Sequence, residues 1–145
     1  MGLIDEIRAG TYVADEPIGA TPGRVATFAE AGARIAAGEN PLPVVRELLD
    51  QAERLPAGEL LATMEERPKP TGNPRGDALL GALAEHLAAG VDTRAPAWTL
   101  EPSRFLDRFW FVSDVPGLRA ISLAQSPVAL KRRGILWPAR SLARV

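Results

Sequence analysis

Apolar residues recur at intervals of three and four along most of the chain, which is the spacing of amphipathic helices. The clearest example is residues 74–89, where leucines form one stripe and Gly90 ends the pattern. The same spacing predicts further helices over 22–37, 41–55, 59–67, 118–125 and 127–133. No alternating pattern of sheet-forming length occurs, and no internal repeat is found. The pattern predicts an all-α protein, a compact bundle of six to eight short helices.

A proline-rich connector, residues 67–74, interrupts the helical pattern in the middle of the chain. Its three prolines and one glycine cannot continue a helix and suit an extended segment. Residues 1–72 carry seven basic and twelve acidic side chains, whereas residues 73–145 carry ten basic and six acidic ones. We therefore expect an acidic amino-terminal helical part (1–66) packed against a basic, aromatic-rich carboxyl-terminal helical part (75–145).

Aromatic and arginine side chains are densest in residues 102–111. Phe105 and Phe109 lie four positions apart, and so do Leu106 and Trp110, which predicts a helix with Phe105 and Phe109 facing the core. Trp110 or Phe111 would then face the other side. Because tryptophan, phenylalanine and arginine are enriched in protein interfaces, we predict a partner-binding site there. The predicted partner-binding residues are Arg104, Arg108, Trp110 and Phe111. The alternative, that most of these rings form the core of the carboxyl-terminal part, stays open.

The end of the chain is basic, since no acidic residue follows Asp114. In an alternative function these cations bind nucleic-acid phosphates. The candidate nucleic-acid-binding residues are Lys131, Arg132, Arg133, Arg140 and Arg144. Two readings without nucleic acid are also open: cations are favoured at helix carboxyl ends, and the acidic and basic parts can neutralise each other within the fold or between copies. Residues 135–137 are expected to form either a short strand or an anchored extended segment.

Few side chains in this sequence are suited to catalysis. The absence of cysteine excludes disulfides, zinc ribbons and cysteine nucleophiles, and the single histidine, His86, has no nucleophile or orienting group beside it. We therefore predict no catalytic residue, metal or cofactor, and an enzyme of unknown class is the second alternative. The amino terminus has no basic leader, and no window approaches the roughly 18 apolar residues of a membrane span. These features predict a cytoplasmic protein.

Residues 75–136 carry a series of short motifs: RGDALL at 75–80, ALAEHL at 82–87, APAWT at 95–99, RFLDRFWF at 104–111, and SP at 126–127 followed by RRGI at 132–135. This series resembles a group of small helical proteins of high-GC bacteria, some of which are regarded as antitoxin-like or regulatory. The resemblance implies non-enzymatic binding of a neighbouring protein, with a toxin as one such partner, and it carries no active site. We expect a regulatory or interaction protein, with DNA as an alternative partner and association between copies left open.

Overall fold

The structure is a computed structural model that describes residues 25–113 and 115–142. The α-helices in these ranges are α1 (Phe28–Ala36), α2 (Pro41–Ala52), α3 (Ala57–Ala62), α4 (Pro74–Gly90), α5 (Arg119–Gln125), α6 (Val128–Lys131) and α7 (Ala139–Leu142). Three short 3-10 helices, η1 (Ala97–Leu100), η2 (Pro102–Arg104) and η3 (Pro116–Leu118), and two strands, β2 (Trp110–Phe111) and β3 (Ile135–Leu136), complete the fold. The protein is a compact helical bundle, which confirms the predicted all-α class.

The helices α2 and α4 begin where the sequence predicts. The side chain of Asn40 accepts a hydrogen bond from the Leu42 amide (3.1 Å), and that of Asn73 accepts one from the Gly76 amide (3.0 Å). A proline follows each asparagine at the first helical position, where its missing amide costs nothing. These starts depend on neighbours in the chain only, which is why the sequence predicts them.

The first helix begins later than predicted. Thr27 and Glu30 form a capping box, in which each side chain accepts a hydrogen bond from the backbone amide of the other. Residues 25–27 are therefore not helical, and the predicted helix over 22–37 is wrong there. The predicted start at Thr21 and Pro22 lies outside the described residues.

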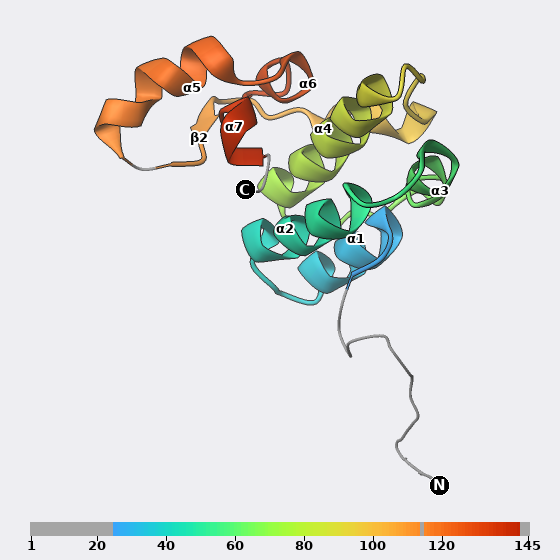
Figure 1. Cartoon of the computed structure of the whole chain (residues 1–145). Helices are drawn as coiled ribbons and strands as arrows, with labels where there is room; N and C mark the ends of the chain where they lie inside the picture. Colours follow the sequence, from blue (N-terminus) through green and yellow to red (C-terminus); the bar gives the residue numbers. More distant parts are fainter. Residues whose placement is uncertain (1–24, 114, 143–145) are drawn as a thin grey trace, which may run out of the picture.

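The helix α4 lies at the centre of the bundle (Figure 1). It packs against α1 and α2 from the amino-terminal part and against α6, η1 and η2 from the carboxyl-terminal part. Its leucines Leu79, Leu80 and Leu83 are fully buried, as their spacing predicts. Buried residues on both sides of the connector therefore belong to one core cluster that surrounds α4.

The predicted helix over residues 102–111 is wrong. Only η2 is helical in this range, and the chain then runs extended into β2, which pairs in parallel with β3. The amides of Leu106 and Trp110 donate to the carbonyls of Arg133 (3.0 Å) and Gly134 (2.7 Å). Partners about 25 residues away thus replace the local bonds of a helix. Of the two expected forms of residues 135–137, the strand is the one present, at β3.

The remaining elements follow the prediction less closely. The helix α5 matches the expected range 118–125, whereas α3 and α6 are shorter than the expected 59–67 and 127–133. The elements η1 and α7 were not predicted, because each is a single turn with too few residues to show a period. Among the described residues, no helix is both long enough and apolar enough to cross a membrane.

Candidate partner-binding surface

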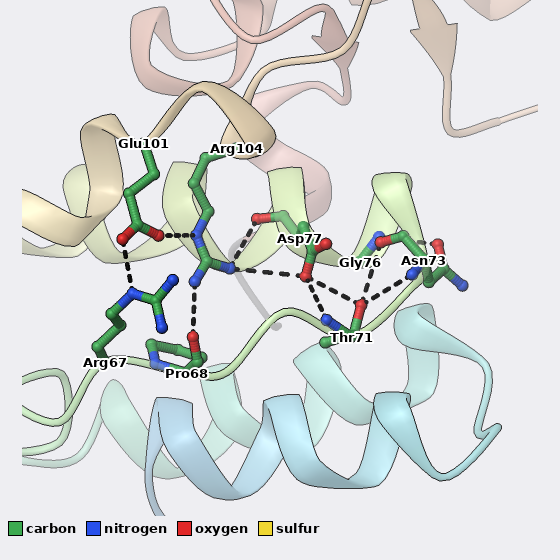
Figure 2. Close-up of polar contacts among 8 residues, drawn as sticks. All are labelled: Arg67, Pro68, Thr71, Asn73, Gly76, Asp77, Glu101 and Arg104. Carbon is green, nitrogen blue, oxygen red and sulfur yellow. Dashed lines mark hydrogen bonds and ion pairs between the residues drawn. The ribbon is translucent and has the colours of Figure 1, made fainter.

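Arg104, one of the predicted partner-binding residues, lies inside the protein. Its side chain is 1% exposed, and its guanidinium sits between the connector and α4 (Figure 2). It donates to the carbonyl oxygens of Pro68 (2.8 Å) and Asp77 (3.4 Å). Burial lowers the pKa of Arg104, while the charges of Asp77 and Glu101 oppose this shift. Because its donors are directed at groups of the same chain, Arg104 is a structural residue in this fold and presents no surface to a partner.

The carboxylates around Arg104 extend this buried network in two directions (Figure 2). The Asp77 carboxylate lies 3.7 Å from Nη1 of Arg104 and accepts hydrogen bonds from the amide (3.1 Å) and hydroxyl (2.9 Å) of Thr71. The Glu101 carboxylate lies 3.5 Å from Nε of Arg104 and accepts a hydrogen bond from Arg67 (2.6 Å). The network fixes the connector against α4 and η2.

Arg133 is buried in the same way and is not available to phosphates. Its side chain is 0% exposed and donates to the carbonyl oxygens of Thr99 (2.7 Å) and Ala129 (2.9 Å) and to the carboxylate of Glu85. The Glu85 carboxylate also pairs with Arg132 at 3.0 Å. Burial lowers the pKa of Arg133, and Glu85 opposes this shift. Two of the five candidate nucleic-acid-binding residues therefore have an acidic partner within the fold.

The other two candidates in the described part of the chain do not share a patch. Lys131 and Arg140 are exposed, but they line different hollows. Arg140 lies beside Trp137, whereas Lys131 lies beside Arg108. Arg144 is outside the described residues.

The aromatic side chains of residues 105–111 differ in how they are covered. The guanidinium carbon of Arg75 lies 4.8 Å from the centre of the Trp110 ring, and that of Arg119 lies 5.0 Å from the Phe111 ring. The guanidinium carbon of Arg133 lies 4.6 Å from the centre of the Phe105 ring. These distances are those of cation–π contacts. Both Trp110 and Phe111 are therefore half-buried beneath arginines of the same chain.

Phe109 is the exposed ring of this segment, with 71% of its surface accessible. The prediction that it faces the core is wrong, because that prediction assumed a helix. In an extended chain successive side chains point to opposite sides, so Phe109 points away from the side on which Trp110 packs. Five large apolar side chains are exposed in the described ranges, and of these Phe109 is aromatic.

Two hollows are lined in part by Phe109. One, of about 490 Å³, includes Arg75 and Trp110, and the other, of about 390 Å³, includes Lys131 and Arg132. Both hollows share the stretch 106–109. We call this region the Phe109 surface, and we define it as Arg75, Leu106, Asp107, Arg108, Phe109, Trp110, Lys131 and Arg132. It brings residues predicted to bind a protein together with residues predicted to bind nucleic acid.

The sequence missed Arg75 and Phe109 as members of this surface. Arg75 lies at the start of α4, about 30 residues before the aromatic segment, and only the tertiary structure places it on Trp110. A strand would place the neighbouring residues Phe109 and Trp110 on opposite sides of the chain. The spacing of four residues between Phe105 and Phe109 is equally compatible with a helix, so the sequence does not distinguish the two.

The candidates for catalysis gain no support from their surroundings. His86 is half-buried on α4, and burial lowers its pKa. No group of three or more potential metal ligands is found in the part of the chain that the structure describes. Comparisons with protein-family models, with curated proteins and with solved structures found no match, and hence identified no enzyme family or homologue.

Proposed function

We propose that this chain is a non-enzymatic, cytoplasmic regulatory protein that binds a protein partner through the Phe109 surface. The observation that carries the proposal is the exposed Phe109 ring, which is 71% accessible and is bordered by Arg75, Arg108 and Lys131. A large ring held in water is unfavourable, and burying it under a partner recovers about 1.5 to 3 kcal/mol. Aromatic and arginine side chains in the centre of a patch are typical of binding hot spots.

Charge on this surface favours a protein partner over nucleic acid. In the basic run 131–133, Arg133 is buried and Arg132 is paired with Glu85. Among the described residues, Lys131 is therefore the exposed cation of this run that has no acidic partner. Asp107 lies on the same surface and repels phosphates. The remaining support for nucleic acid is the proximity of Lys131 and Arg108 to an exposed ring on which a base can stack.

The resemblance of residues 75–136 to small helical proteins of high-GC bacteria, some of which are regarded as antitoxin-like or regulatory, supports a neighbouring protein, such as a toxin, as the partner. The resemblance implies binding without catalysis, which requires an accessible contact surface. The Phe109 surface meets this requirement, because it combines an apolar centre with a charged rim.

Capture from the native host tests the proposal with three versions of the tagged full chain. The first is the unchanged protein, the second is Phe109→Ser, and the third is Val128→Ser, a matched control because Val128 is 76% exposed and lies outside the Phe109 surface. We expect a partner that co-purifies with the unchanged chain and with Val128→Ser but is lost with Phe109→Ser. Equal recovery of that partner with all three versions would refute the proposal.

A further inference from the structure

The two hollows beside Phe109 have the same electrostatic character. Arg75 lies in one hollow, Lys131 and Arg132 lie in the other, and Arg108 lines both. Asp107 is the single acidic residue on this surface. The surface therefore presents cations in each of the two hollows that Phe109 lines.

Two of these arginines have donors that are not used within the fold. Arg75 and Arg108 are exposed, and neither side chain makes a hydrogen bond or ion pair with any described residue. The guanidinium carbon of Arg75 lies over the Trp110 ring, 4.8 Å from its centre, and stacking of this kind leaves the N–H donors of an arginine available to a ligand. A guanidinium held in this way is prepared for a carboxylate, because two parallel N–H groups match its two oxygens.

The helix α4 adds to the positive character of this site. Its first residues, Pro74 and Arg75, line the larger hollow together with the capping residue Asn73. The amino end of a helix of 17 residues carries a positive partial charge. This charge acts in the same direction as the Arg75 guanidinium.

From this arrangement the geometry points to a specific kind of ligand: a short acidic segment of a protein partner, with a large apolar side chain between its carboxylates. The apolar side chain packs on Phe109, and the carboxylates on either side contact Arg75 and Arg108 in one hollow and Lys131 in the other. The inference rests on the proposed function and deepens it, since it states the chemistry of the partner. Charge complementarity is the reason to choose an acidic segment.

A binding experiment with a defined peptide tests this assignment on the full chain. The probe is a fluorescein-labelled, amidated peptide of sequence Glu-Asp-Leu-Phe-Asp-Glu, and binding is followed by fluorescence anisotropy at low and at physiological salt. One control peptide replaces Leu-Phe by Ser-Ser, and another replaces the four acidic residues by lysine. We expect the probe to bind, with an affinity that falls with salt, and we expect both control peptides to bind at least about tenfold more weakly.

Charge-reversal variants locate the binding site. Arg108→Glu and Lys131→Glu are each expected to weaken peptide binding by about tenfold or more, since each replaces an attraction by a repulsion. Arg54→Glu is the matched control, because Arg54 is an exposed arginine that lies just after α2 and outside the Phe109 surface. Its effect should stay within about twofold. Circular dichroism of each variant verifies that it is folded.

The outcomes separate this inference from the proposed function. One outcome is that the peptide does not bind at about 1 mM, while the unchanged chain still captures a partner that Phe109→Ser does not capture. This outcome would refute the acidic segment and leave the proposed function standing. If the peptide does not bind and capture from the host shows no partner that depends on Phe109, both the acidic segment and the proposed function are refuted. Binding of a single-stranded oligonucleotide that is lost in Arg108→Glu, without peptide binding, would assign the surface to nucleic acid and overturn the inference. Equal weakening by Arg54→Glu and Arg108→Glu would also overturn it.

Discussion

Replacing Arg104 by methionine removes the guanidinium at the centre of the buried network while keeping an unbranched apolar stem. The variant loses the hydrogen bonds to the carbonyls of Pro68 and Asp77, as well as the ion pairs with the Asp77 and Glu101 carboxylates. The Asp77 carboxylate is left buried with only Thr71 to donate to it among the described side chains. Removing one partner of a buried ion pair typically costs about 3 to 5 kcal/mol.

The magnitude follows from burial, and Arg67 provides an internal comparison. Arg67 pairs with the same Glu101 at 2.6 Å, but its side chain is 48% exposed. Exposed pairs contribute about 0 to 1 kcal/mol, because water and salt screen them. We therefore expect Arg67→Met to cost at most about 1 kcal/mol and Arg104→Met to cost about 3 kcal/mol or more. For a chain of this size, the larger loss lowers the Tm by about 6 to 20 °C.

Urea unfolding followed by circular dichroism measures both variants against the unchanged chain. Similar slopes of unfolding free energy against urea in all three proteins would show that the folded states are comparable. A cost for Arg104→Met within about 1 kcal/mol of that for Arg67→Met would refute the argument that burial determines the contribution of each arginine. A variant more stable than the unchanged chain would refute it more strongly.

Three further expectations can be measured on the purified protein. Phe109→Ala should change the free energy of unfolding by less than about 1 kcal/mol, because the ring is 71% exposed; a loss of about 3 to 5 kcal/mol would mean that Phe109 is a core residue. Gly81→Ala should destabilise the protein by about 1 kcal/mol or more, because its Cβ would lie 3.0 Å from Cβ of Arg104, and a more stable variant would contradict this close approach. Burial lowers the pKa of His86 in the folded state, so the unfolded chain binds a proton first, and stability should fall as the pH decreases from about 7 to about 5. In urea titrations, the free energy of unfolding of the His86→Gln variant should fall less over this pH interval than that of the unchanged chain. An equal fall in both proteins would exclude His86 as a cause.

The parts of the fold that depend on near neighbours could be predicted from the order of residues alone. The class of protein, the starts of α2 and α4 at Asn40 and Asn73, and the buried leucine stripe of α4 all follow from spacing and capping within a few residues. The late start of α1 is also encoded locally, in the capping box of Thr27 and Glu30. In that case the proline at position 22 suggested an earlier start.

Only the tertiary structure decided the conformation of residues 102–111. The spacing of Phe105 and Phe109 is compatible with a helix, and nothing nearby in the chain excludes it. The extended form is chosen because the amides of Leu106 and Trp110 find carbonyl partners in the segment 133–134. A pairing over such a distance depends on how α4 and α6 pack, which a local pattern does not contain.

The tertiary structure also decided which charged and aromatic side chains are exposed. The sequence indicated an arginine-rich and aromatic region, and the Phe109 surface lies within it. Exposure could not be predicted because Arg104 and Arg108 are equivalent in type and lie four positions apart, yet one is buried and the other is exposed. An arginine is buried only where carbonyls and carboxylates from distant segments converge on it, as Pro68 and Asp77 do on Arg104. Among the described residues, Arg75, Arg108 and Phe109 lie in the candidate site and receive no such cover from the fold.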